Sequence, residues 1–360
     1  KLDEEFIRQM PVIHNSSINT NILSLFKKIS PLFLLFLSVI ILKKKSYYSD
    51  MQGNNYFHKS YLKKITGVLI AIIAVIWTLD NRPFSIHHGF DPYNNYDEEP
   101  YQKLIDYVRE KKGNSLGIVW SSPEAKSAGT ISGISLITEK YLDDVVKTQG
   151  HNGFAGIYGD ARTAHLPGGE WDKMLMEFSE EKRKNPPFIF GEADYHGPQD
   201  GLDFDFIKTV VFLDENEPVS VENITKAMLA GRSYAVSKQG KKEMVLDEFR
   251  VYLPDTNISA VSGETIRVNR GDKLKVSIRG YCENLPKNFS APARISLISD
   301  GKELSSVSSD AGKFQLAIDI SGDTLREKTY LRFYISGPEA GELLSNPIFI
   351  QSSSDGAQGE

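Results

Sequence analysis

Three side chains that could bind a metal follow a short apolar run near the middle of the chain. Residues 188–190 are apolar, and Glu192, Asp194 and His196 come directly after them. Alternate side chains of an extended strand lie on one face, so we expect the two carboxylates and the imidazole to share a face. Oxygen and imidazole donors together suit a divalent ion such as zinc, manganese or iron. The stretch therefore predicts part of a metal site; a surface strand with a chance acidic pair is the alternative.

Residues 83–240 supply the elements that would position this site. Short apolar runs alternate there with helical periodicity, which predicts an α/β fold. Helices are predicted where apolar residues recur around Leu104, around Met174, and from Ser220, a plausible N-cap, to the stop at Gly231. The predicted strands are residues 84–88, 116–120, 131–138, 154–158, 188–190 and 209–213. This number of strands favours a small, irregular β/α barrel over a full eightfold one.

Further candidate ligands also follow predicted strands. They are His87 or His88, Glu124 and Asp160. Barrel enzymes collect their chemistry at the mouth formed by the carboxyl ends of the strands, so ligands from several strands would converge there. Each residue also has a structural alternative: the histidines as polar residues after an apolar segment, Glu124 as a helix cap, and Asp160 as a turn residue. His165, in a loop, is expected to be solvated.

Three motifs in this region resemble the polymerase and histidinol phosphatase (PHP) superfamily. Residues 191–196, Gly-Glu-Ala-Asp-Tyr-His, are similar to its Gly-x-Asp-x-His motif. Residues 223–235 resemble its closing helix with the Gly-Arg-x-Tyr ending, and residues 171–175 match its Trp-Asp-x-x-Leu. The resemblance covers residues 84–237. It implies a distorted seven-stranded barrel that binds two or three divalent metals and hydrolyses phosphoesters.

The resemblance assigns roles to individual residues. Asp194 and His196 would be catalytic metal ligands, joined by Glu192, Asp160, Glu124 and His88. Arg232 would bind a substrate phosphate, or else form a structural salt bridge. The bound ion would lower the pKa of a water molecule.

The chain also departs from the family pattern. His87 and His88 are adjacent where the family has His-x-His, and Ser121-Ser122 stands where an imidazole is expected. Serine is a poor neutral ligand, so one metal position would be weakened.

Residues 1–82 predict a membrane region. Two uncharged apolar runs, residues 29–42 and 65–79, are flanked by lysines that can snorkel. Buried core helices are the alternative. Lysines outnumber the single acid, Asp50, in the loop between the runs, which favours a cytoplasmic loop and places residues 83–360 outside the cytoplasm. Because the first residue is Lys1, we expect the chain to be a fragment or a processed piece.

Residues 241–351 have a different pattern of apolar residues. Seven short alternating runs separated by turn signals predict an immunoglobulin-like β-sandwich, and residues 352–360 a disordered tail. The sandwich would pack on the barrel or bind a glycan or protein. One cysteine, Cys282, excludes an internal disulfide framework, and the net charge of −5 gives no sign of nucleic-acid binding.

The leading hypothesis is a membrane-anchored, metal-dependent hydrolase of a small phosphoester or a phosphorylated glycan. The alternative is a catalytically degenerate PHP-like domain that serves as a binding or scaffold module. The pair Asp194 and His196 favours the enzyme, and Ser121-Ser122 favours the degenerate domain.

Overall fold

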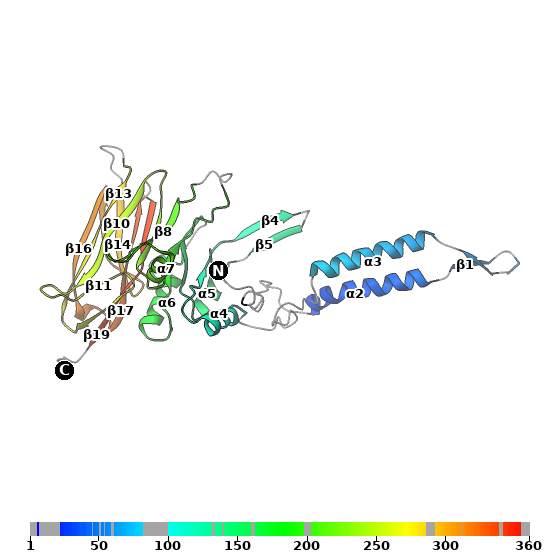
Figure 1. The fold of residues 1–360 in the computed structure, drawn as a ribbon, viewed down its shortest axis with the longest axis horizontal. Coiled ribbons are helices and arrows are strands. Elements are labelled where there is room, and N and C mark those ends of the chain that lie inside the picture. Colours follow the sequence, from blue (N-terminus) through cyan, green and yellow to red (C-terminus); the bar gives the residue numbers. More distant parts are fainter. Residues whose placement is uncertain are drawn as a thin grey trace. The chain divides into compact units, whose positions relative to one another are not determined.

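The protein divides into two compact units, Lys1–Lys111 and Lys112–Glu360. The structure is a computed structural model (Figure 1). It describes residues 6, 22–44, 46–49, 52–53, 55–58, 61–81, 100–131, 134–138, 140–159, 163–197, 203–285, 292–310, 312–337 and 341–353. The candidate sites at His87, His88 and Asp160 and the tail from residue 354 onward lie outside the described residues.

The first unit contains two long helices that pack against each other, α2 (Ile22–Lys43) and α3 (Tyr61–Asn81). Between them lies an antiparallel pair of strands, β1 (Ser46–Ser49) and β2 (Asn55–His58). A third helix, α4 (Pro100–Lys112), ends at the boundary between the two units. It begins with proline, which suits the first helical position, and buries Ile105 and Val108 as the periodicity predicted.

The two long helices contain the apolar runs that predicted membrane spans. Each helix also takes in the neighbouring lysines, Lys27 and Lys28 in α2 and Lys63 and Lys64 in α3. Within the described residues, no helix combines the length and the apolar character needed to cross a membrane. This finding corrects the prediction of two spans at residues 29–42 and 65–79, and with it the placement of residues 83–360 outside the cytoplasm.

The second unit begins with a three-stranded parallel sheet. Its order is β3-β6-β7, formed by β3 (Val119–Trp120), β6 (Gly153–Ile157) and β7 (Phe188–Gly191). Every residue of β6 is buried, as expected for a parallel strand covered on both faces. Two helices accompany the sheet, α5 (Leu142–Lys147) and α6 (Glu170–Ser179), and the apolar face of α6 joins the sheet residues in one hydrophobic cluster.

The described strands do not close into the predicted barrel. The run at residues 131–138 is not one strand but the end of an antiparallel hairpin, β4 (Ser127–Ile131) and β5 (Ile134–Thr138). The run at 209–213 falls on β8 (Ile207–Val211), which pairs antiparallel with β9 (Ser233–Ser237) after α7 (Val221–Leu229). The other edge of β9 pairs with β18 (Gly341–Ser345). The backbone N–H and C=O groups of β9 that could have paired with a barrel strand are therefore bonded within a different sheet.

Two β-sheets that share one hydrophobic core make up the rest of the unit (Figure 1). The smaller has the order β11-β10-β13-β16, from β10 (Glu243–Tyr252), β11 (Ser259–Val261), β13 (Lys273–Glu283) and β16 (Lys313–Ser321). The larger has the order β12-β19-β17-β18-β9-β8 and also includes β14 and β15. Its remaining strands are β12 (Thr265–Asn269), β14 (Pro292–Ser299), β15 (Lys302–Asp310), β17 (Lys328–Gly337) and β19 (Ile348–Ser353); a short 3-10 helix, η2 (Gly322–Thr324), follows β16.

The larger sheet joins parts of the chain that the sequence analysis had assigned to different folds. The segments that form β8 and β9 lie within residues 83–240, the region expected to form the barrel, yet they extend the sheet that contains β17 and β18. The predicted combination of a (β/α) barrel with a separate sandwich is therefore corrected. The described fold is mixed, mostly β-strands in sheets, with a small parallel α/β layer.

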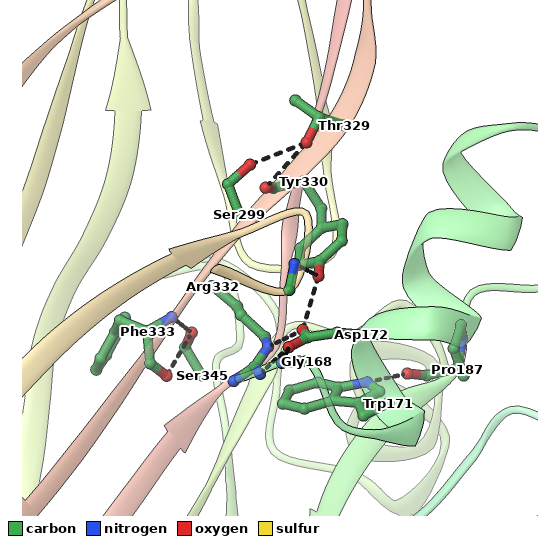
Figure 2. Close-up of polar contacts among 11 residues, drawn as sticks. Gly168, Trp171, Asp172, Pro187, Ser299, Thr329, Tyr330, Arg332, Phe333 and Ser345 are labelled. Atoms are coloured by element: carbon green, nitrogen blue, oxygen red, sulfur yellow. Dashed lines mark hydrogen bonds and ion pairs between the residues drawn. The ribbon is translucent and has the colours of Figure 1, made fainter. Parts of the chain in front are cut away.

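A buried ion pair ties this α/β layer to the larger sheet (Figure 2). Asp172, in α6, is 1% exposed, and Arg332, in β17, is 0% exposed. Nε of Arg332 donates to Oδ1 of Asp172 at 2.6 Å, and Nη2 donates to Oδ2 at 2.7 Å. The same carboxylate accepts from the hydroxyl of Tyr330 at 2.7 Å and from the backbone N–H of Gly168 at 2.8 Å. Both oxygens of this buried charge are thus satisfied.

Aromatic groups enclose the pair. The guanidinium carbon of Arg332 lies 4.6 Å from the centroid of the Trp171 ring, and the indole N–H of Trp171 donates to the carbonyl of Pro187 at 2.7 Å. Burial and the neighbouring Asp172 carboxylate raise the pKa of Tyr330. Gly301 approaches so closely that a Cβ there would lie 3.2 Å from Cα of Gly168, and its φ of +72° also favours glycine.

A buried asparagine makes the second connection. Oδ1 of Asn346 accepts the backbone N–H of Ile189, in β7, at 2.8 Å. Its Nδ2 donates to the carbonyl of Ile189 at 3.3 Å and to the carbonyl of Ser233, in β9, at 3.2 Å. Near the end of β7, Thr209 Oγ1 accepts the N–H of Gly191 at 2.9 Å. Side chains from the segments around the larger sheet thus bind backbone groups of β7.

Removing one partner of the buried ion pair is expected to be strongly destabilising. Arg332→Met leaves the Asp172 carboxylate buried without its cation, which lowers the free energy of unfolding by about 3–5 kcal/mol. Urea unfolding of the full chain measures this. The exposed pair Arg270 and Asp323, 3.9 Å apart, provides the matched control: Arg270→Met should change stability by less than about 1 kcal/mol. Equal losses in the two variants would contradict the role assigned to the buried pair.

The amide of Asn346 is expected to be irreplaceable by a carboxylate of the same shape. Asn346→Asp replaces the donor that faces the carbonyls of Ile189 and Ser233, so it should destabilise the fold by at least about 2 kcal/mol. Asn284→Asp, which alters an exposed amide bonded to the carbonyl of Lys241 at 3.1 Å, should change stability by about 0.5 kcal/mol or less. Thermal unfolding monitored by circular dichroism compares them, and a neutral Asn346→Asp would refute the argument.

Candidate functional site

The candidate site lies at the carboxyl ends of the parallel strands. Ser121 and Ser122 follow β3 directly, and Glu192 follows β7 directly. Parallel strands end at the same edge of their sheet, which brings these residues together. In the structure Glu192 lies next to the segment after β3. What Glu192 binds there is a set of protein donors.

Both carboxylate oxygens of Glu192 accept hydrogen bonds from the two serines. The hydroxyl of Ser121 donates to Oε1, and Ser122 donates to Oε2 from its backbone N–H at 2.9 Å and from its hydroxyl at 3.2 Å. Ser122 has a φ of +38°, uncommon for a residue with a side chain. The serines that occupy the place of the expected imidazole therefore hold the carboxylate in a hydrogen-bonded bridge between the ends of β3 and β7.

Glu124 is similarly engaged and is 4% exposed. Its Oε1 accepts from the backbone N–H of Thr163 at 2.8 Å and from the Thr163 hydroxyl at 2.7 Å, and its Oε2 accepts from the N–H of Ala164 at 3.1 Å. Its own N–H donates to the hydroxyl of Tyr158 at 2.9 Å. Glu124 thus holds the turn at Thr163 and Ala164, which precedes α6, and does not act as the helix cap named as its alternative.

Asp194 and His196 lie close together but on the surface. Oδ1 of Asp194 is 3.3 Å from Nε2 of His196, and the two side chains are 64% and 72% exposed. Strand β7 ends at Gly191, and Asp194 has a φ of +50°, so the chain is no longer extended there. The expectation that Glu192, Asp194 and His196 share one strand face is therefore wrong, because alternation holds only along extended backbone.

The described residues do not assemble the expected ligand cluster. No group of three or more histidine, cysteine, aspartate or glutamate side chains suited to a metal occurs among them. This corrects the prediction that the described ligands converge on a common ion. Of the described candidate ligands, Glu124 and Glu192 fit a divalent ion poorly, because their carboxylate oxygens already accept protein hydrogen bonds.

Arg232, predicted to bind phosphate, is held by acidic side chains. Its Nη1 lies 2.8 Å from Oδ2 of Asp214 and its Nη2 lies 3.4 Å from Oε2 of Glu217. This is the salt-bridge alternative named in the sequence analysis. The residue follows α7, whose predicted cap is confirmed: the hydroxyl of Ser220 accepts from the N–H of Asn223 at 3.1 Å.

His165 differs from its predicted environment. It is 2% exposed, and its ring centroid lies 5.3 Å from that of Tyr334 in an edge-on arrangement. The expectation of a solvated loop histidine is wrong, since the residue contacts the larger sheet. Its neighbours Ala164 and Leu166 were the available sign that this loop carries apolar residues.

Comparison with protein-family models and with curated proteins gives no match to this chain. The resemblance to the PHP superfamily therefore stays a prediction based on the three motifs.

The bonds to Glu124 predict a structural role that can be measured. In Glu124→Gln the new amide NH₂ has to face one of the N–H groups of Thr163 and Ala164, so the free energy of unfolding should fall by about 1–3 kcal/mol. Asp194→Asn, an exposed carboxylate from the same predicted ligand set, should change it by about 0.5 kcal/mol or less. Urea titration of both variants provides the comparison. A Glu124→Gln variant as stable as the parent would contradict the structural role.

Proposed function

We propose that the α/β layer is a catalytically degenerate PHP-like domain that serves as a binding or scaffold module. The observation that supports this proposal is the state of two of the four candidate ligands within the described residues, Glu124 and Glu192. Each carboxylate accepts at least three hydrogen bonds from donors of its own chain. A ligand committed in this way has to lose several charge-assisted hydrogen bonds before it can coordinate an ion.

The serine substitution gives this argument a chemical basis. An imidazole donates a lone pair to a metal, whereas the hydroxyls of Ser121 and Ser122 donate hydrogen bonds to Glu192. A site with an imidazole at this position would use Glu192 as a co-ligand. With serine at this position, the Glu192 carboxylate accepts hydrogen bonds from Ser121 and Ser122. The same position thus changes from metal coordination to loop stabilisation.

The second candidate is metal-dependent hydrolysis of a phosphoester. The proximity and exposure of Asp194 and His196 favour it, since both side chains reach solvent. In this alternative the two residues would bind the ion together with Asp160 and His88, and Arg232 would leave Asp214 to bind a phosphate of a small molecule or a glycan. Glu124 and Glu192 would remain structural.

Metal content and turnover of the full chain separate the two candidates. After incubation with manganese or zinc and removal of the excess, elemental analysis should find no stoichiometric ion, and a panel of phosphoesters should show no turnover above a metal-only blank. His196→Ala and the matched surface variant Asp319→Asn should behave like the parent. Stoichiometric metal together with turnover that disappears in His196→Ala, but not in Asp319→Asn, would establish the hydrolase instead.

A further inference from the structure

A cavity of about 220 Å³ lies where four segments of the second unit meet. Its walls come from the residues after β8, from Arg232 between α7 and β9, from the middle of β10, and from the turn after β11. Apart from Arg232, it shares no residue with the predicted metal site. Its volume is below the roughly 300–1,000 Å³ typical of drug-sized ligands, so it suits a small molecule or a single chemical group.

The walls of the cavity are fixed by the fold itself. The N–H of Phe212 donates to the carbonyl of Arg232 at 2.8 Å, and the N–H of Gly263 donates to the carbonyl of Pro347 at 2.7 Å. A Cβ on Gly263 would lie 1.9 Å from the carbonyl oxygen of Ala230, and its φ is +85°, so this position requires glycine. The turn after β11 is therefore held against the end of α7, and the cavity exists before any ligand binds.

Part of the charge in the wall is already neutralised. Asp214 pairs with Arg232 at 2.8 Å, and Glu248 pairs with Arg279 at 2.6 Å. These four groups balance one another. The remaining charged groups of the wall therefore decide which ligand charge the cavity prefers.

The remaining groups carry a formal charge of −1, from two carboxylates and one guanidinium. The side chains of Asp247 and Arg250 are exposed, and neither makes a side-chain hydrogen bond or a close ion pair in the described part of the chain. Arg250 also attracts the carboxylate of Glu248 electrostatically. The carboxylate of Glu264 accepts from the backbone N–H of Val261 at 3.0 Å. Asp247 sits at a bulge of β10, between Leu246 and Glu248, a feature that redirects a side chain.

Two further features point to a ligand with polar and apolar parts. The hydroxyl of Ser262 is buried and has no hydrogen-bond partner among the described residues, an uncommon state for a polar group. Phe212, Phe249 and Val261 supply apolar surface to the same cavity. Aromatic faces and carboxylates together attract organic cations.

We infer that this cavity binds a small organic cation, an ammonium group on a short apolar stem. The ammonium group is attracted by Asp247 and Glu264, and the stem contacts the apolar wall next to Phe212. Arg250 adds a positive charge to the wall and disfavours ligands with a second cationic group. The inference goes beyond the proposed scaffold role and does not depend on the fate of the metal site.

Saturation-transfer NMR on the full chain tests this with n-butylammonium as the probe and with n-butanol and butyrate as its neutral and anionic counterparts. Saturable transfer to n-butylammonium is expected, with an affinity at least about fivefold higher than for either counterpart, the scale of a cation–π contact. Asp247→Asn and Glu264→Gln should each weaken it by about fivefold. Asp319→Asn, an exposed carboxylate on β16 of the same sheet as Asp247, should leave it unchanged.

Several results would overturn the inference. They are equal binding of n-butanol and n-butylammonium, absence of transfer to n-butylammonium, and unchanged affinity in both carboxylate variants. Preferential binding of butyrate that disappears in Arg250→Gln would mark an anion site instead. Thermal unfolding midpoints that agree with the parent within about 2 °C show that a loss of binding does not reflect unfolding.

Discussion

The buried ion pair between Asp172 and Arg332 is the constraint on which the second unit depends. A carboxylate and a guanidinium away from water are tolerated only when each finds a partner of matching geometry. Arg332 offers two N–H groups to Asp172, while Tyr330 and Gly168 complete the shell of the carboxylate. Because α6 contributes the anion and β17 the cation, the ion pair is complete only when the α/β layer packs on the larger sheet. The hydrogen bonds of Asn346 likewise form only when β7 and β9 are both in place.

Local patterns predicted much of the secondary structure but little of the strand pairing. The helices α6 and α7 follow from apolar spacing and from the cap at Ser220, since both signals lie within a few residues. The pairing of β9 with β18 joins residues about a hundred positions apart, and nothing in either strand identifies its partner. The motif that contains Asp172 was noticed, yet a lone aspartate on an amphipathic helix usually faces solvent, so its buried role needed the partner at Arg332.

At the candidate site, too, the sequence indicated which residues to consider but not where their side chains lie or what they contact. The sequence predicted a set of metal ligands, and one of them, Glu192, lies beside the segment after β3. The prediction that Glu192, Asp194 and His196 share one strand face was wrong. It assumed an extended backbone beyond Gly191, whereas Asp194 adopts a left-handed conformation. The bonds to Glu124 were out of reach, since the donors Thr163 and Ala164 are about forty residues away. Ser121-Ser122 was the one local sign that a carboxylate here has donors for partners.

Carboxylates at the ends of parallel strands can therefore serve two purposes with the same geometry. Convergence at one edge of a sheet brings acidic side chains from separate loops within reach of a common partner. When that partner is an ion, the loops are stabilised by coordination; when it is a set of hydroxyl and backbone N–H donors, they are stabilised by hydrogen bonds. Glu124 and Glu192 follow the second course. A change from an imidazole to a serine would then replace metal coordination by hydrogen bonds at this edge of the sheet, while the loops keep their conformation. In this way a fold can be retained after its catalytic site is lost.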